Sequence, residues 1–400
     1  MQSELRKKSE DQKELVPDQV PSRFKLRSHV RILQQISPRE LKARAFRSGP
    51  TSFLATQMAQ IYGLIRPRIS RSVTLAVISL GGSVRETDCK TYWQECGLLT
   101  IPSIVIVPIQ GARYVYGRDP GSDIENALDV QISGAMAAMQ ATSVTVRFYS
   151  APNSLGGFLA AIKQANTDNV NTISISWGAN EIAFGRFWLS AYDTAFQTSR
   201  LKGINVFAAA GDNGSTDGGR GLNVDFPSSS PNVVSCGGTT LICPTLNYSD
   251  SSTVETAWSY NPSEDWGGGG GVSAYFTRPS FQNGIAPYGL GAVQTYRTVP
   301  DISGPADPVT GNWRIFYNGN WYLVGGTSCD SPFFAGFVAG LNIRRSILPQ
   351  LYSSGNRSSG FHDVRSGSNN NSNFSNRYTA GTGYDCCTGL GSLNGSSISL

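Results

Sequence analysis

The chain has 400 residues, of which 40% are hydrophobic and 44 are glycine, a composition typical of a loop-rich globular protein with one large or two medium cores. It has no apolar run of 18 residues, so we expect no transmembrane helix. Residues 1–11 are highly charged and lack an apolar segment, so they do not have the pattern of a secretory signal.

The net charge of +5 comes from the N-terminal residues. Residues 1–50 contain 12 Lys or Arg and 6 Asp or Glu, whereas the rest of the chain is nearly balanced. We expect residues 1–50 to be a solvated basic arm or linker, and residues 51–400 to form a single domain. A role for the arm in binding nucleic acid or another polyanion is the weaker alternative, because few aromatic side chains are interleaved with its basic ones.

From about residue 72 the chain alternates between predicted strands and predicted helices. Strands are predicted at 73–80, 143–149, 171–177 and 204–210, and helices at 124–139, 155–165 and 187–202. This alternation predicts an α/β fold with a doubly wound parallel sheet that helices cover on both faces. The active site of such a fold forms beyond the carboxyl ends of the strands, which is where Asp212 follows the strand at 204–210.

A candidate nucleophile lies at the start of a predicted buried helix. Residues 325–332 read Gly-Gly-Thr-Ser-Cys-Asp-Ser-Pro and precede an apolar run, which places Ser328 at the helix start. The chain has two histidines, His29 and His362, and neither has the Gly-flanked setting of a serine protease's general base. Another group must therefore accept the proton of Ser328, and carboxylates are the best candidates.

Glu125 and Asp129 are such a pair. They are four residues apart on the predicted helix at 124–139, so they lie on the same face, where two like charges repel. A shared proton would relieve this repulsion and raise one apparent pKa. The alternative is an exposed acidic first turn favoured by the helix dipole.

Asp212 is the third candidate carboxyl. When protonated it could donate a hydrogen bond to a tetrahedral oxyanion, together with the backbone N–H of Ser328. The alternative is a turn aspartate that caps the Gly-Ser loop after it. Asp330 adds an acidic group near Ser328, and we expect its charge to raise the pKa values of the other carboxyls.

The order and spacing of several motifs resemble the sedolisin family, the serine-carboxyl peptidases. The matching segments are Glu125-Asn-Ala-Leu-Asp129, Ser174-Ile-Ser-Trp177-Gly, Ala208-Ala-Ala-Gly-Asp212, Gly237-Gly-Thr239, Glu255-Thr-Ala-Trp258, Pro300-Asp301-Ile-Ser and Gly326-Thr-Ser328. The resemblance implies a subtilisin-like fold, with Ser328 as nucleophile and Glu125 as its base. It also implies that Asp129 orients Glu125 and that Asp212 stabilises the oxyanion.

From this resemblance we expect a monomeric endopeptidase that cleaves proteins or peptides at acidic pH, outside the cell or in an acidic compartment. The alternatives are an inactive relative that binds other molecules and, less favoured, a subtilisin-like hydrolase that uses histidine. Family members carry a long folded propeptide, and residues 1–50 are too few to form one. The sequence therefore leaves activation by self-processing open.

A second constellation lies near the C-terminus. Asp363 and Asp385 flank Gly-rich turns, and carboxylates with backbone carbonyls are the hard oxygen ligands that suit Ca²⁺. The family resemblance implies a Ca²⁺ site formed by these two side chains with the carbonyls of Val364, Gly381 and Gly383. Ordinary Asp-Gly turns are the alternative.

Overall fold

The computed structural model describes residues 24–37, 40, 51–259, 261, 266–369 and 378–400. Its centre is a ten-stranded sheet made of β4 (Ile69–Ser79), β5 (Ser103–Pro108), β6 (Ala141–Ser150), β7 (Thr172–Ile175), β9 (Asn205–Ala209), β11 (Val234–Ile242), β12 (Val254–Ala257), β15 (Ile302–Pro305), β18 (Phe361–His362) and β19 (Ser392–Leu393). The strand order is β18-β19-β15-β11-β9-β7-β4-β6-β5, with β12 beside β11. All neighbours on this path are parallel except β18, and β12 is antiparallel as well.

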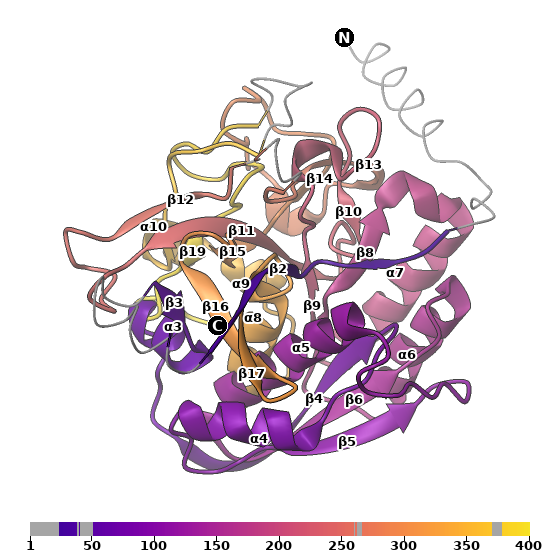
Figure 1. Ribbon diagram of the computed structural model, residues 1–400. Coiled ribbons are helices and arrows are strands. Elements are labelled where there is room, and N and C mark those ends of the chain that lie inside the picture. The colour runs from indigo at the N-terminus through magenta and orange to yellow at the C-terminus, as the bar shows by residue number, and fades with distance from the viewer. Residues whose placement is uncertain (1–23, 38–39, 41–50, 260, 262–265, 370–377) are drawn as a thin grey trace.

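Helices cover both faces of this sheet, as the sequence predicts (Figure 1). The helices are α3 (Ala55–Ile61), α4 (Glu86–Glu95), α5 (Pro120–Ala138), α6 (Leu155–Thr167), α7 (Gly185–Leu201), α8 (Asp330–Gly340), α9 (Leu348–Leu351) and α10 (Ser354–Ser359). In β4, Leu75 and Val77 belong to the core that includes α5 and α8, whereas Ala76 and Ile78 belong to the core that includes α6 and α7. Successive side chains of a strand point to opposite faces, so this division shows a sheet that is buried on both sides.

Three smaller sheets surround the centre. The first consists of β1 (Arg27–Ser28), β8 (Trp177–Asn180) and β10 (Asp225–Phe226). The second consists of β2 (Arg31–Ile36), β17 (Asn320–Gly325), β16 (Asn312–Tyr317) and β3 (Ser52–Phe53). The third consists of β13 (Gly271–Thr277) and β14 (Tyr296–Val299). Short 3₁₀ turns lie at 181–184, 214–216 and 280–282. The first two sheets flank the carboxyl end of β7 and the start of α8, so they border the position of Ser328.

The strands predicted at 73–80, 143–149 and 204–210 and the three predicted helices are confirmed within a few residues. The strand predicted at 171–177 is divided into β7 and β8. The sequence analysis did not find β5, which is an edge strand with an exposed face, or the hairpin of β16 and β17.

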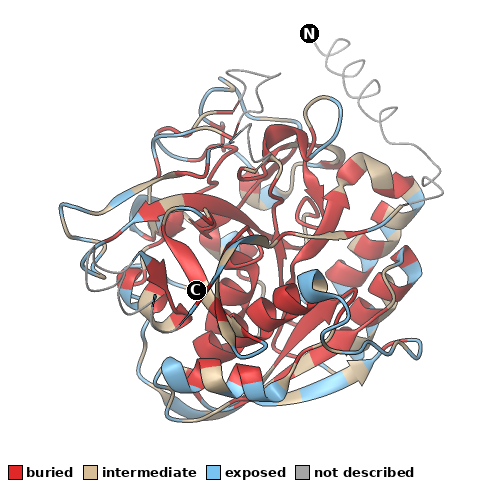
Figure 2. Cartoon of the chain, viewed as in Figure 1, coloured by how far each residue is buried: buried red, intermediate tan, exposed pale blue. Residues whose placement is uncertain are grey.

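Helix α5 lies inside the molecule along most of its length (Figure 2). Its start is fixed by Asp119, whose side chain accepts a hydrogen bond from the Ser122 N–H at 3.2 Å, and by Pro120 at the first helical position. All residues from Asp123 to Ala138 are buried. Glu125 and Asp129 are therefore interior groups, which excludes the alternative of an exposed acidic first turn.

The N-terminal segment differs from the expected solvated arm. Residues 1–23, 38–39 and 41–50 lie outside the described residues, but residues 24–37 pack on the domain. Strand β1 pairs antiparallel with β8, and β2 pairs antiparallel with β17, so the segment crosses the face of the molecule (Figure 1). A boundary at residue 50 therefore separates β1 and β2 from the fold to which they belong.

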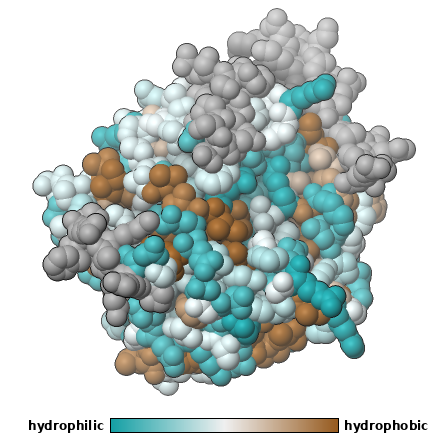
Figure 3. Space-filling model, viewed as in Figure 1, coloured by the Kyte–Doolittle hydropathy of each residue, from teal (hydrophilic) through white to brown (hydrophobic). Residues whose placement is uncertain are grey.

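On the face shown in Figure 3, hydrophobic residues form separate small patches between hydrophilic ones. Among the described residues, none of the helices combines the length and the apolar character needed to cross a membrane. All seven cysteines are free, and six of them are buried.

Candidate active site

Ser328 lies between β17 and α8, at the turn where the strand becomes a helix. Gly326 in this turn has φ +100°, a left-handed conformation that favours glycine. A Cβ at this position would overlap the backbone carbonyl oxygen of His29 and lie 2.7 Å from Asp212 Oδ2. Glycine is required at position 326 because the backbone of another segment approaches it closely.

The side chain of Ser328 faces the buried carboxyls of α5. Its hydroxyl donates a hydrogen bond to Glu125 Oε2 at 3.0 Å. Asp129 Oδ1 accepts a hydrogen bond from Ser176 Oγ at 2.6 Å, and Ser176 follows β7. Glu125 Oε1 and Asp129 Oδ2 are buried and have no hydrogen-bond partner among the described residues. The structure thus brings together the serine and both carboxyls that the sequence selected.

Burial controls the protonation of this pair. Desolvation raises the pKa of Glu125 well above its ordinary value, and the neighbouring Asp129 raises it further. Hydrogen bonds from Ser328 and the Val30 backbone oppose this effect. Desolvation also raises the pKa of Asp129, against the hydrogen bond from Ser176. The pair therefore retains a proton at pH values where exposed carboxyls are ionised.

Asp212 lies on the other side of Ser328, beyond the end of β9. Its Oδ1 accepts hydrogen bonds from the Thr327 backbone N–H and hydroxyl, both at 2.8 Å. Its Oδ2 is 3.2 Å from Arg31 Nε. The Ser328 backbone N–H points to the carbonyl oxygen of His29 at 3.4 Å. Asp212 Oδ2, the Ser328 N–H and a peptide carbonyl therefore meet beside Gly326.

Asp330 differs from the sequence-based expectation. It is fully buried in the first turn of α8, and neither of its carboxyl oxygens has a hydrogen-bond partner among the described residues. Desolvation raises its pKa well above the ordinary value, so the group is neutral at acidic pH. A neutral Asp330 cannot raise the pKa values of the other carboxyls through its charge.

Neither histidine side chain contacts Ser328. His362 lies partly buried in β18 and stacks on Tyr248 with ring centroids 3.5 Å apart. His29 is fully buried, and its Nε2 is 3.2 Å from Asp225 Oδ2. Burial lowers the pKa of both imidazoles to about 4. The expectation that histidine is not the base agrees with these positions, but the sequence analysis did not place the His29 backbone beside the nucleophile.

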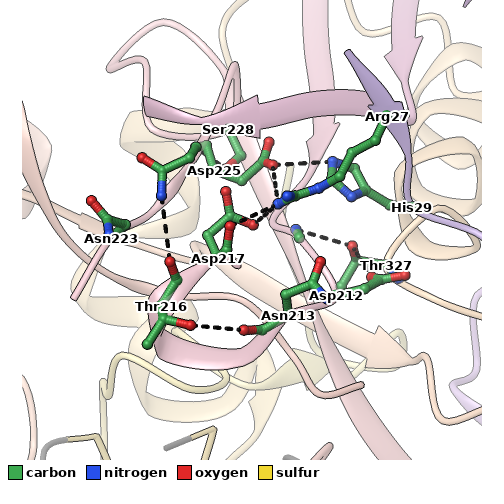
Figure 4. Close-up of polar contacts among 12 residues, drawn as sticks. Arg27, His29, Asp212, Asn213, Thr216, Asp217, Asn223, Asp225, Ser228 and Thr327 are labelled. Atoms are coloured by element: carbon green, nitrogen blue, oxygen red, sulfur yellow. Dashed lines mark hydrogen bonds and ion pairs between the residues drawn. The ribbon is translucent and has the colours of Figure 1, made fainter. Parts of the chain in front are cut away.

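A cluster of buried acidic side chains adjoins this site (Figure 4). Asp217 and Asp225 are both fully buried, and the Arg27 guanidinium pairs with each of them. Burial raises the pKa of Asp217 to about 8 and that of Asp225 well above its ordinary value. The sequence analysis missed this cluster, because single aspartates in Gly-rich loops are usually turn residues.

The predicted calcium ligands lie close together in two turns. Asp363 accepts hydrogen bonds from the Gly383 N–H at 3.1 Å, and Asp385 Oδ2 accepts one from the Gly381 N–H at 3.0 Å. Asp385 is fully buried, and burial raises its pKa to about 6. Among the described residues, no cluster of three or more His, Cys, Asp or Glu side chains could hold a metal ion, so backbone carbonyls would have to complete a site.

Comparisons with known proteins identify the family of the chain. A model of the subtilase family matches residues 119–345. Kumamolisin from Bacillus sp. (strain MN-32) is 36% identical over 380 residues, which cover 92% of this chain and 66% of the relative. The chain belongs to the subtilase family, in its sedolisin branch. Sedolisin from Pseudomonas sp. (strain 101) is 31% identical over 85% of this chain and 59% of its own length.

The fold comparison leads to the same branch. Pseudomonas sedolisin, a serine-carboxyl proteinase solved with two molecules of pseudo-iodotyrostatin, superimposes with a TM-score of 0.74 and 29% identity. The match covers 86% of this chain and 96% of that one. The subtilisin-like α/β fold is therefore confirmed. The chain spans about two thirds or less of the length of the curated relatives named above.

In two of the sedolisin-like motifs, an acidic residue makes its contacts away from Ser328. Glu255 accepts hydrogen bonds from four hydroxyl groups, those of Tyr62, Thr239, Tyr248 and Ser392, at 2.6–2.8 Å. Asp301 forms a fully buried ion pair with Arg297 at 2.6 Å. These acidic groups hold neighbouring segments together.

The buried carboxyls predict how stability depends on pH. Above about pH 4 the unfolded chain releases carboxyl protons that the folded chain still holds, so each raised pKa makes stability fall as pH rises. The two histidines have the opposite effect between pH 4 and 6.5. Between pH 6.5 and 8 we expect the melting temperature of the Ser328→Ala chain to fall, and to fall less in a chain that also carries Asp217→Asn. Calorimetry would measure both slopes, and equal slopes would contradict the raised pKa of Asp217.

Proposed function

We propose that this protein is a serine-carboxyl endopeptidase in which Ser328 is the nucleophile, Glu125 the general base and Asp129 the residue that orients Glu125. The observation that carries the proposal is the 3.0 Å hydrogen bond from Ser328 Oγ to the buried Glu125. No histidine side chain contacts that hydroxyl among the described residues, so the carboxyl is the proton acceptor within reach.

In the proposed reaction, Ser328 Oγ attacks the carbonyl carbon of a peptide bond while Glu125 accepts the hydroxyl proton. Glu125 then donates this proton to the leaving amine, and the acyl group stays on Ser328. A water molecule hydrolyses the ester after Glu125 removes its proton. Asp129, held by Ser176, carries the proton that lets two buried carboxyls lie side by side.

Asp212 and the Ser328 N–H are the proposed oxyanion donors. Thr327 fixes Asp212 Oδ1 through two hydrogen bonds, which leaves Oδ2 on the side where the His29 carbonyl lies. A protonated Oδ2 would donate to the negative oxygen of a tetrahedral intermediate. An ionised carboxylate would repel that oxygen, so the mechanism requires acidic conditions.

We expect Ser328→Ala to abolish hydrolysis of a denatured protein substrate at pH 4, because no other hydroxyl contacts Glu125 among the described residues. Glu125→Gln should lower turnover by roughly 10²-fold or more, the range of general acid–base catalysis. His362→Ala, which changes a partly buried histidine outside the site, is the matched control and should retain activity. Hydrolysis by Ser328→Ala at the wild-type rate would instead indicate that a contaminating peptidase cleaves the substrate and that this protein is an inactive relative.

The pH profile should be acidic. The proposed mechanism needs Asp212 in its protonated form, in which it can donate a hydrogen bond to the oxyanion. We expect an optimum below pH 6 and a fall toward neutrality. Asp212→Asn keeps a donor at every pH, so this variant should be slower but should lose less activity between pH 5 and 7. Asp330→Asn is the control, because Asp330 is already neutral at acidic pH. A wild-type rate that rises steadily from pH 5 to pH 8 would refute the carboxyl mechanism.

We also propose that Ca²⁺ binds between the two C-terminal turns. The donor set fits, because two carboxylates converge on the turn at 381–383 and one of them, Asp385, is buried with a raised pKa that a cation would offset. Asp363, Asp385 and the carbonyls of Val364, Gly381 and Gly383 would hold the ion. Arg365 Nε, at 2.7 Å from Asp363, competes for that carboxylate.

Calcium that binds only the native state stabilises it by mass action and so raises its melting temperature. The gain in the free energy of unfolding is about 2.7 kcal/mol when the free Ca²⁺ concentration is 100 times Kd. We expect a chelator to lower the melting temperature of the Ser328→Ala chain at neutral pH, and added Ca²⁺ to restore it. Combining Ser328→Ala with Asp385→Asn should remove this response. A melting curve that excess chelator leaves unchanged would show that the turns are held by their own hydrogen bonds.

The substrates we propose are proteins or peptides, and the setting is extracellular or an acidic compartment. Kumamolisin and sedolisin, which the chain resembles, are the basis for this expectation. The monomeric state that the sequence analysis expects stays a prediction.

A further inference from the structure

A large cleft lies outside the candidate active site. Its volume is about 840 Å³, within the range of pockets that hold small organic ligands. Neither Ser328 nor any of the three carboxyls assigned to the mechanism lines it. Its walls come from Tyr248, the turn at 284–286, the end of α10 with β18 and the residues after it, the turn at 382–384 and Leu390. The cleft is therefore a separate candidate binding site.

Two arginine side chains lie at this cleft. Arg357 is in the last turn of α10, and its side chain has no hydrogen bond or ion pair among the described residues. Arg365 uses only its Nε, which lies 2.7 Å from Asp363 Oδ2, so its two terminal nitrogens have no partner in the described part of the chain. Asp363 is the one acidic side chain among the described residues that line the cleft. The free donors are guanidinium groups, whose planar fork fits a carboxylate.

The rest of the wall is apolar, because the hydroxyl groups of its tyrosines are already bonded. The Tyr248 hydroxyl donates to Glu255 at 2.8 Å, and the Tyr384 hydroxyl donates to the Pro300 carbonyl at 2.9 Å. The apolar lining consists of the rings of these tyrosines with Ile285, Ala286, Phe361 and Leu390. An inorganic anion could pair with the arginines but would leave this surface uncovered. The cleft therefore fits a carboxylate that carries an apolar group.

Asp363 links this cleft to the proposed Ca²⁺ site. Its carboxylate contacts both Arg365 and the Gly383 N–H. A cation held by Asp363 would offset the negative charge that faces Arg365, and it would add positive charge beside the cleft. Both effects favour an anion in the cleft. By linkage, the anion would strengthen Ca²⁺ binding by the same factor.

We propose that this cleft binds peptides that end in an apolar residue, with the C-terminal carboxylate between Arg357 and Arg365, and that Ca²⁺ at Asp363 strengthens this binding. The last side chain of the peptide covers the aromatic and aliphatic wall. Hydrolysis of any peptide bond creates a new C-terminal carboxylate, so a peptidase produces ligands of this class. Only the calcium dependence rests on the proposed Ca²⁺ site.

N-acetylphenylalanine is a minimal probe, because it has the carboxylate and one apolar side chain. It is ionised at pH 6, since α-carboxyls have pKa values of roughly 3.3–3.7. NMR titration of the Ser328→Ala chain in Ca²⁺ should show saturable binding of this acid. The affinity should be at least roughly tenfold higher than that for N-acetylphenylalaninamide, which lacks the charge. Equal affinities for the acid and the amide, or no saturable binding of the acid, would overturn the proposal.

Adding Arg357→Gln to this chain should weaken binding of the acid at least roughly tenfold. Arg357 is exposed, so the change should leave the melting temperature unaltered. Arg113→Gln, the matched change of an exposed arginine between β5 and α5, should leave the affinity unchanged. Unchanged binding in the Arg357→Gln chain would place the acid elsewhere, such as at the candidate active site, and would overturn the assignment.

Sulfate distinguishes an apolar carboxylate from an inorganic anion. Because sulfate cannot cover the apolar wall, it should displace the acid only at concentrations at least roughly tenfold above the Kd of the acid. Displacement by sulfate at that Kd itself would show a site for any anion and would overturn the assignment to apolar carboxylates.

Arg365→Gln tests the coupling, because two opposite changes are expected. Without the acid, this variant of the Ser328→Ala chain should bind Ca²⁺ more tightly, since the competing guanidinium is gone, whereas it should bind the acid less tightly. A gain or a loss of both affinities together would contradict the shared role of Asp363.

Calcium itself gives the second test of the coupling. Replacing Ca²⁺ by a chelator should weaken binding of the acid to the Ser328→Ala chain roughly fivefold or more, the lower end of coupling between sites. Equal affinity with and without bound Ca²⁺ would overturn the coupling. A chain that binds no Ca²⁺ would refute the coupling together with the proposed Ca²⁺ site, and titrations of the acid and the amide in chelator would still decide the carboxylate site.

Discussion

The arrangement around Ser328 depends on the burial of carboxyl groups without enough positive charge to balance them. Glu125, Asp129, Asp212 and Asp330 are each fully buried. An isolated buried carboxylate costs several kcal/mol, so such groups either hold protons or find cationic partners. The first two share a proton, Asp330 keeps its own, and Asp212 lies beside Arg31. In the proposed mechanism, protons held by these buried carboxyls take the place of a histidine base.

The same constraint explains the N-terminal segment. Asp217 and Asp225 are buried near Asp212. The Arg27 guanidinium from β1 pairs with both, and the His29 imidazole, which burial keeps neutral above about pH 4, lies beside Asp225. The segment therefore supplies both a pair of edge strands and the charge that the cluster lacks. Two of the basic residues that the sequence analysis assigned to a solvated arm, Arg27 and Arg31, instead contact buried carboxyls. Composition alone cannot distinguish these cases, because a basic side chain has the same charge in water and in an acidic cluster.

Much of the fold was predictable because it depends on local pattern. The buried strands at 73–80 and 204–210 are apolar runs, and the helix predicted at 124–139 begins four residues earlier, at Pro120. The edge strand β5, which has no buried residue, and the hairpin of β16 and β17 were not predicted. The run of β-branched residues at 104–107 is a signal that could have indicated β5. Ser328 was grouped with Glu125 and Asp129 through the resemblance of their motifs to the sedolisin family. Asp225 could not, because its significance arises from long-range contact with His29.

The tethering of the segment at 24–37 has an energetic consequence for the acidic cluster beside it. Because the segment belongs to the same chain, Arg27 and His29 lie beside Asp217 and Asp225 at the high effective concentration of a tethered ligand. Without the segment the carboxyls would lose these partners, and a buried carboxyl without a partner is costly. The segment in turn is held by the pairing of β1 with β8 and of β2 with β17. Strand pairing and the polar contacts of Arg27 and His29 therefore support each other.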